Sequence, residues 1–159
     1  MTKNTRSDIA NANEYLGTAL IYAEDVMAAY NIQFEMWQYA IGQSTAEELE
    51  AVIGYGTMAA KRLFTIIGIP DNDFTDAFID IIAGFAPVEH VAFANEMNQG
   101  LAALRTLRDY FENHTNVQAV EFRTGFLEFT SHNGIRTRGL CSTEVEYIGI
   151  LINGTWNTV

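Results

Sequence analysis

The spacing of apolar residues changes along this chain, and that change constrains the fold more than any other feature. Up to about His114 the apolar side chains recur at three- and four-residue steps, as they do in helices. Beyond Thr115 the step shortens towards two, and the pairs Asn133-Gly134 and Asn153-Gly154 are strong β-hairpin signals. We therefore predict an α+β fold, with about four N-terminal helices followed by a C-terminal antiparallel β-meander of four to five short strands.

The helical part, residues 7–114, contains a start signal for each predicted helix. The starts are Ser7 or Asp8, the capping-box sequence Ser44-Thr45-Ala46-Glu47, the acidic cap Asp71-Asn72-Asp73, and Pro87. The first helix is expected to run to Ile41, where Gly42 ends it, and its apolar residues cover more than one stripe. A helix with that pattern is contacted on several sides.

The β part, residues 117–159, divides at turn residues. The predicted strands are Val117 to Arg123, Phe126 to His132, Ile135 to Cys141, Glu144 to Ile152 and Thr155 to Val159. A two-residue turn at Asn133-Gly134 would place Phe126 opposite Cys141. The run from Val145 to Ile152 is apolar on both faces, which predicts that it is the buried central strand.

Length and composition favour one domain, residues 1–159, because 48% hydrophobic residues are ample for a core. No stretch has the roughly eighteen uninterrupted apolar residues of a membrane span, and Met1 to Asp8 lacks a secretory pattern. A single Cys141 fits a reducing compartment. We expect a soluble cytoplasmic protein without membrane contact. Its low content of charged residues also favours a homo-oligomer that covers apolar surface.

Negative charge is concentrated in the helical part. The chain has a formal net charge of −11, and fourteen acidic residues between Asp8 and Leu104 stand against only Lys61 and Arg62. Phosphate binding needs clustered basic residues, so we expect no direct nucleic-acid binding through the helices. Helical acids suit a basic protein partner instead.

We therefore predict a binding or inhibitory protein whose acidic helical face occupies a basic, nucleic-acid-handling surface, as immunity, anti-defence and DNA-mimic proteins do by general analogy. Glu14 and Asp25, like Glu24 and Glu35, lie eleven residues apart, which places each pair on one side of a continuous helix. The predicted face comprises Glu14, Glu24, Asp25, Glu35, Glu47, Glu48, Asp73, Asp76 and Asp80. The simpler alternative is a solvated acidic surface that only keeps the protein soluble.

An arginine cluster in the β part supports an alternative function. Arg136 and Arg138 are two apart in one predicted strand, with Ser131 and Phe129 directly across, and Arg123 could join from the next strand. Two guanidinium groups beside a hydroxyl suit a small anionic ligand such as a nucleotide. Surface arginines balanced by neighbouring glutamates are the competing explanation.

Catalytic and metal-binding motifs are not found in the sequence. It lacks the Gly-rich phosphate motifs and the GxSxG nucleophile motif, and its three histidines and one cysteine lack metal-ligand spacing. His132 and Cys141 fall at opposite ends of the predicted hairpin, and Cys141 is best explained as a small core residue. We assign no catalytic residue, metal or cofactor and favour a non-enzyme. A structural or assembly subunit is a further alternative.

Overall fold

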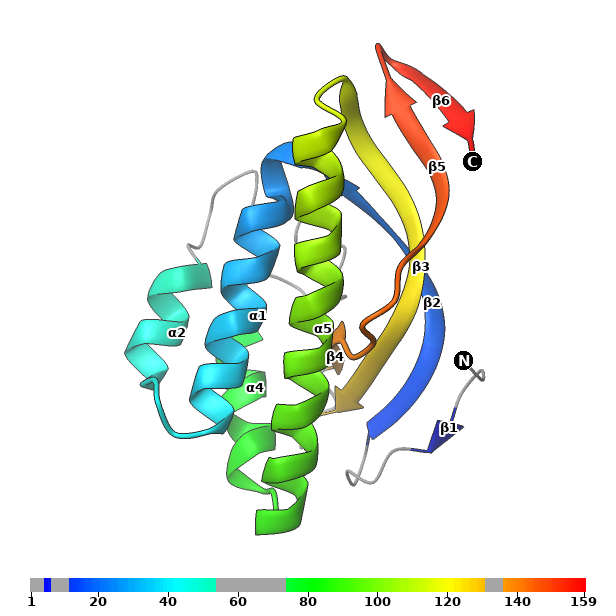
Figure 1. Cartoon of the computed structure of the whole chain (residues 1–159). Coiled ribbons are helices and arrows are strands. Elements are labelled where there is room, and N and C mark those ends of the chain that lie inside the picture. The colour runs from blue at the N-terminus through cyan, green and yellow to red at the C-terminus, as the bar shows by residue number, and fades with distance from the viewer. Residues whose placement is uncertain (1–4, 7–11, 54–73, 131–135) are drawn as a thin grey trace.

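A layer of helices packs beside one antiparallel sheet in this computed structural model (Figure 1), which describes residues 5–6, 12–53, 74–130 and 136–159. The strands are β1 (Thr5–Arg6), β2 (Ala12–Tyr22), β3 (Val117–Thr130), β4 (Arg136–Leu140), β5 (Glu146–Ile152) and β6 (Thr155–Thr158). The helices are the 3-10 turn η1 (Ala23–Asp25), α1 (Val26–Ala40), α2 (Ala46–Ile53), α4 (Phe74–Ala83) and α5 (Pro87–Asn113). The α+β class is confirmed, whereas the order of helices before strands is not.

The longest strand, β3, organises the sheet. The strand order is β1-β2-β3-β5-β6, and β4 also pairs with β3. One edge of β3 pairs with β2, while the other edge pairs first with β5 and then with β4. Side chains on both faces of β3, among them Phe122 and Leu127, are 0% exposed. The segment predicted as the buried central strand, Val145–Ile152, does contain an interior strand, since β5 lies between β3 and β6, but β3 is the central strand and most side chains of β5 are only half-buried.

The predicted helix from Ser7 to Ile41 is wrong over Ala12–Tyr22, which forms strand β2. This segment pairs residue by residue with Ala119–Phe129 of β3. Its second half alternates strictly, because Ala19 and Ile21 are buried while Thr18 and Leu20 are exposed. That alternation is the two-residue period of a strand, and pairing with a segment a hundred residues away decides between two patterns that the local sequence allows.

The helix starts agree more closely with the sequence. Helix α5 begins at Pro87, and the Glu89 carboxylate accepts the Ala86 N–H at 2.9 Å. Helix α4 begins at Phe74, directly after the predicted cap Asp71-Asn72-Asp73, which lies outside the described residues. None of the helices described is long and apolar enough to span a membrane.

The cap of α2 is shifted by one residue from the prediction. The Thr45 hydroxyl accepts the Glu48 N–H, and the Glu48 carboxylate accepts the Thr45 N–H, both at 3.2 Å. Ser44, which we expected to cap the helix, instead donates its hydroxyl hydrogen to the Glu35 carboxylate on α1. The reciprocal bonds are those of a capping box, with Thr45 and Glu48 in place of Ser44 and Glu47.

The strands of the β part differ from the prediction in number and register. The two segments Val117 to Arg123 and Phe126 to His132 belong to the single strand β3 as far as Thr130. Phe126 pairs with Leu140 and not with Cys141, and Thr130 pairs with Arg136. The register is therefore shifted by one residue, and the Asn133-Gly134 turn itself lies outside the described residues.

Helices α1 and α5 lie side by side on the concave side of the sheet (Figure 1). Gln33 on α1 is 3% exposed and donates its amide hydrogens to the carbonyls of Met97 and Leu140, at 3.0 and 2.8 Å. Its amide oxygen accepts the Leu140 N–H at 3.1 Å. One buried side chain thus joins α1, α5 and β4, and it holds the edge of β4 against the helices.

Candidate functional site

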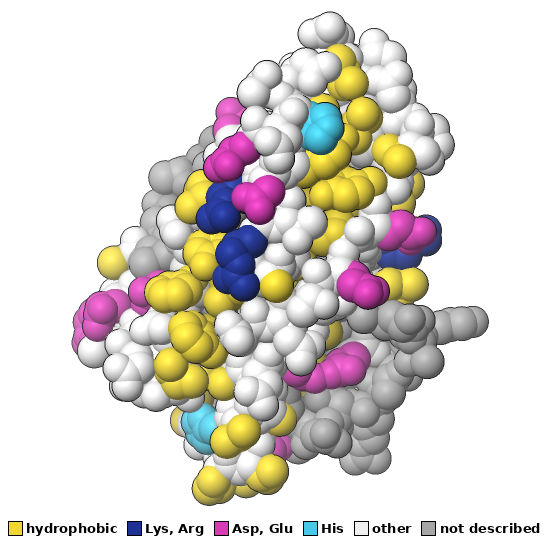
Figure 2. Space-filling view, viewed as in Figure 1, with side chains coloured by type: hydrophobic (Ala, Val, Ile, Leu, Met, Phe, Trp, Pro, Cys, Tyr) yellow, Lys and Arg dark blue, Asp and Glu magenta, His cyan; other side chains and the backbone are white. Residues whose placement is uncertain are grey.

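The predicted acidic face is divided among several elements. Glu14 lies in β2 and not on a helix, and Asp25 is only 2% exposed, so neither can belong to the proposed helical ridge. Asp80 is half-buried on α4. Asp73 lies outside the described residues, as does the side chain of Asp76. Figure 2 shows the acidic side chains of this view in separate groups.

Four predicted acids are distributed along α1 and the start of α2. Glu24 is exposed in η1, one turn before α1, and Glu35 is half-buried near the other end of α1. The bond from Ser44 fixes Glu35 beside the loop that leads into α2. The first turn of α2 then presents the exposed side chains of Glu47 and Glu48.

A groove runs along one side of α1, and Glu35 is part of its lining. It has a volume of about 430 Å³ and is lined by Ala28, Asn31, Phe34 and Glu35. Three of these residues are spaced by three or four positions, so they follow one side of the helix. This α1 groove offers an aromatic ring and a carboxylate within one concave surface.

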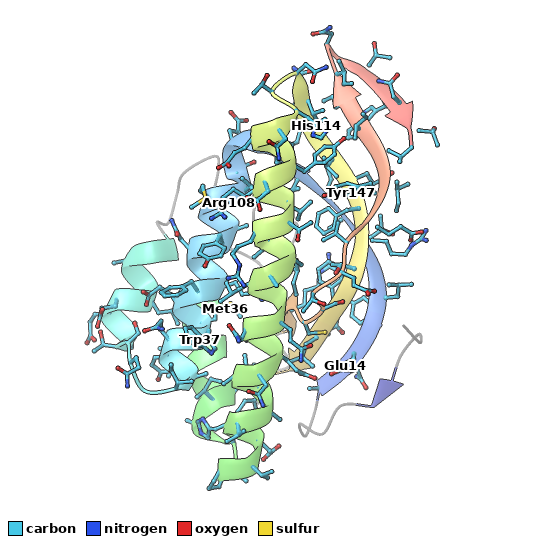
Figure 3. The ribbon with its side chains drawn as sticks, viewed as in Figure 1. Glu14, Met36, Trp37, Arg108, His114 and Tyr147 are labelled. Carbon is cyan, nitrogen blue, oxygen red and sulfur yellow. The ribbon has the colours of Figure 1, made fainter. Side chains whose placement is uncertain are left out.

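Aromatic rings continue from the α1 groove along the helix. Tyr30 stacks on Phe34 with ring centroids 6.1 Å apart, and Phe34 meets Trp37 at 5.6 Å. Arg105 of α5 donates to the Tyr30 hydroxyl at 3.4 Å, which ties this end of the stack to α5. Figure 3 labels Trp37 and Arg108 in this part of the structure.

Two arginines of the predicted anion site, Arg123 and Arg138, do not share a face of the sheet. Arg138 pairs with Glu128, and Arg123 lies an odd number of residues from Glu128 along β3, so the two arginines are on opposite faces of the sheet. Arg138 stacks 4.1 Å above the Phe126 ring and donates to the Tyr15 hydroxyl at 2.7 Å. Ser131 lies outside the described residues, as does the side chain of Arg136.

Arg123 belongs to a different feature, a cleft at the edge of β3. Its guanidinium forms an ion pair with Glu146 of β5 at 2.7 Å. The cleft has a volume of about 530 Å³ and opens where β3 changes partner from β5 to β4. We name it the β3 cleft. Its lining comprises Leu16, Thr106, Arg123, Thr124, Gly125, Ser142, Thr143, Glu144, Val145 and Glu146.

Cys141 is buried, as the sequence predicts. Its side chain is 7% exposed in the core, and burial raises the pKa of the Cys141 thiol to about 12, with a further contribution from the Glu14 carboxylate. A thiol with so high a pKa carries almost no thiolate near neutral pH, and the thiolate is the nucleophile. Cys141 is thus unsuited to nucleophilic catalysis.

The two described histidines pack against aromatic rings at opposite ends of α5. His90 meets the edge of Phe85 at 5.6 Å, and His114 stacks on Tyr110 at 4.2 Å. Tyr110 also stacks on Tyr147 of β5 at 4.6 Å, in the region between α5 and the sheet where Figure 3 labels Tyr147. Burial, followed by the neighbouring Tyr110, raises the pKa of Tyr147.

Comparison with known proteins assigns no family to this fold. No protein-family model matches the chain, and no curated protein and no solved structure matches it.

Both surfaces depend on contacts that the sequence only partly indicates. Glu35 was predicted as a partner-binding acid, whereas no functional role was predicted for Phe34. The β3 cleft could not be found from spacing, because it depends on the pairing of β3 with two different strands. The sequence does become polar at Ser142, Thr143 and Glu144, after an apolar segment, and this change in composition was the signal that could have indicated the cleft.

Proposed function

We propose that this chain is a binding protein that occupies a basic surface of a partner protein, and that the α1 groove is the centre of the contact. The observation that carries the proposal is the groove itself, in which Phe34 and Glu35 line one concave surface of about 430 Å³. A lysine or arginine side chain fits this pair, because its stem and charge can lie over an aromatic ring while a carboxylate binds its hydrogens.

The electrostatics around the groove support the same partner chemistry. Residues 12–53 include seven acidic residues and no lysine or arginine. Glu24, Glu47 and Glu48 are exposed near the two ends of α1. Such a field attracts a basic surface over a distance of about a Debye length, roughly 10 Å at 0.1 M salt, and orients it before contact.

The aromatic residues along α1 can contribute binding affinity that surface charge alone does not provide. Rim charges mainly affect the association rate, whereas Tyr and Trp side chains near the centre of an interface contribute most of the affinity. The half-buried stack of Tyr30, Phe34 and Trp37 is placed for that role. A partner whose basic surface normally holds a nucleic-acid backbone would present arginines and lysines at suitable density.

The anion-binding alternative has less support. Arg123 and Arg138 lie on opposite faces of the sheet, and each already contacts an acid or an aromatic group. A single ligand therefore cannot bridge the two guanidinium groups from one side of the sheet.

The test is a pull-down from a lysate of the native cell at low salt and at about 0.5 M salt, with the bound proteins identified by mass spectrometry. Wild type is compared with Phe34→Ala and Glu35→Gln. The matched control is Glu112→Gln, which removes the same charge from an exposed carboxylate near the C-terminal end of α5 that does not line the groove. We expect one basic protein to be retained at low salt, weakened at high salt, and lost in both groove variants but not in the control.

Equal retention by all four proteins would contradict the assignment to the α1 groove. Equal loss from Glu35→Gln and Glu112→Gln would mean that net charge alone governs binding. If no protein is retained at either salt concentration, the proposed function is wrong.

Self-association in the cytoplasm is a separate part of the proposal. Leu16 and Leu20 on β2 and Trp156 on β6 are 41%, 39% and 48% exposed, and these apolar side chains are available for contact with a second copy. Sedimentation of the purified protein over a range of concentrations tests this directly, and a monomer at all concentrations contradicts it.

A further inference from the structure

The β3 cleft lies at an interruption of the sheet. Pairing of β3 with β5 ends at Arg123, and pairing with β4 begins at Phe126. Thr124 and Gly125 lie between, and residues 141–145 cross this edge of β3 without forming a strand. The volume of about 530 Å³ is within the range of roughly 300–1,000 Å³ that small-molecule sites occupy.

The loop that closes the cleft is held in place by three hydrogen bonds. The Cys141 N–H bonds to the Gly125 carbonyl at 2.9 Å, which continues the edge of β4. The Thr124 hydroxyl donates to the Glu144 carbonyl at 2.6 Å, and the Ser142 hydroxyl oxygen accepts the Glu144 N–H at 3.2 Å. Since Thr124 is 2% exposed, the backbone of Glu144 is anchored to a buried residue.

Charges of both signs line the cleft. The Arg123 side chain is 41% exposed, and one of its terminal nitrogens binds Glu146. A guanidinium has five N–H donors, so that single contact leaves several for a ligand. Within the described part of the chain, the Glu144 carboxylate forms no hydrogen bond or ion pair. The cleft thus offers Arg123, a cation with further donors, and Glu144, a carboxylate two residues before Glu146.

We propose that the β3 cleft binds a small zwitterionic amino acid, whose carboxylate is held by Arg123 and whose ammonium group is held by Glu144. A simple anion would be repelled by Glu144 and Glu146 and by the net charge of −11. A simple cation would leave the Arg123 donors unused. The Arg123–Glu146 pair does not prevent binding, because an exposed ion pair is weak and its guanidinium can be shared.

This site is separate from the α1 groove, so its test does not depend on the proposed basic partner. Ligand binding is measured by calorimetry and by thermal unfolding with three probes of equal chain length: 4-aminobutyrate, butyrate and butylamine. L-Alanine is added as a probe with adjacent charged groups. We expect 4-aminobutyrate or L-alanine to bind with a dissociation constant of about 1 mM, and the two singly charged probes to bind at least about tenfold more weakly.

The variants Arg123→Gln and Glu144→Gln test which groups bind the ligand. Each should weaken the zwitterion by about tenfold, since each removes one charged contact. Arg108→Gln is the matched control, because Arg108 also pairs with acids on the surface, Asp109 and Glu112, but lies on α5 outside the cleft. Unfolding of each variant without ligand confirms that it is folded.

Three results would overturn the proposal. One is that neither zwitterion gives a heat of binding or raises the unfolding temperature when its concentration is about 20-fold the expected dissociation constant. Another is equal binding of butyrate or butylamine, which would assign the cleft to a singly charged ligand. The third is unchanged zwitterion binding in both cleft variants.

Discussion

The side-chain amide of Gln33 bonds both backbone polar groups of Leu140, 107 residues further along the chain. The same amide donates a second hydrogen to the Met97 carbonyl of α5. A buried amide that bonds three backbone groups is costly to remove, because the N–H and the carbonyl of Leu140 would lose this partner without gaining water. This contact fixes where β4 ends and therefore where residues 141–145 leave the sheet.

Replacing Gln33 should destabilise the protein strongly. Gln33→Leu keeps a similar size but leaves the N–H and the carbonyl of Leu140 without this partner and removes the extra bond to the Met97 carbonyl, so we expect a loss of roughly 2–4 kcal/mol in the free energy of unfolding. Urea denaturation followed by circular dichroism measures it. Gln38→Leu on the half-buried side of α1 is the control and should change stability by about 0.5 kcal/mol or less. Similar values for the two variants would contradict the role of Gln33.

Gly100 should not tolerate a side chain. A Cβ atom at this position would clash with the Leu140 carbonyl oxygen and the Gln33 amide nitrogen. Alanine is normally better than glycine within a helix by about 1 kcal/mol, but here overpacking should produce a net loss of roughly 2 kcal/mol. The control is Gly84→Ala, because the nearest atom to its Cβ would be the Ile81 carbonyl oxygen at an ordinary 3.6 Å. Thermal unfolding of the two variants gives the comparison, and a stabilised Gly100→Ala would show that the close approach is not real.

The sequence predicts local features of this fold well, since they depend on neighbouring residues. The Asn153-Gly154 hairpin is confirmed, because both residues have positive φ, 51° and 77°, and Ile152 pairs with Thr155. Such a turn needs φ values that asparagine and glycine adopt most easily. Pro87 begins α5 for a similarly local reason, since its fixed φ suits the first helical position.

Long-range pairing explains most of what the sequence does not predict. Ala12–Tyr22 fits either a helix or a strand by its local pattern, and only its pairing with β3 decides between them. The one-residue error at the β3–β4 hairpin has a similar origin. The structure places Glu128 opposite Arg138, where the sequence predicted Phe129. Because side chains alternate along a strand, that error changes which groups share a face, and it explains why Arg123 lies on the opposite face of the sheet from Arg138.

The buried thiol of Cys141 predicts how stability depends on pH. Burial raises the pKa of the Cys141 thiol in the native protein from an ordinary 9.0 to about 12. The unfolded chain therefore loses this proton first as the pH rises, and unfolding becomes easier between pH 9 and pH 12, by at most about 1.4 kcal/mol per pH unit. Below pH 9 the thiol is protonated in both states and has no effect on the pH dependence.

Cys141→Ala isolates this contribution from the tyrosines and lysines that ionise in the same range. We expect its free energy of unfolding to fall less steeply than that of wild type between pH 9 and pH 11, as measured by urea denaturation. Native wild type should also react with a thiol reagent at pH 8 only as fast as it unfolds. Parallel pH profiles for the two proteins, or rapid labelling without unfolding, would show that the thiol is accessible.

The start of α2 provides a test of hydrogen bonding at constant charge. Glu47 and Glu48 are both exposed acids in the first turn, so both interact favourably with the positive end of the helix dipole. Only the Glu48 carboxylate accepts the Thr45 N–H, at 3.2 Å, and the Thr45 hydroxyl oxygen accepts the Glu48 N–H in turn.

Alanine substitutions separate the two acids. Glu48→Gln and Glu47→Gln would each remove one charge but leave a polar acceptor, so Glu48→Ala and Glu47→Ala give the clearer comparison. We expect Glu48→Ala to cost about 0.5–1 kcal/mol more than Glu47→Ala, and Thr45→Ala to cost about 1 kcal/mol. Chemical denaturation measures all three, and a larger loss for Glu47→Ala would favour the capping box at Ser44 and Glu47 that the sequence alone predicts.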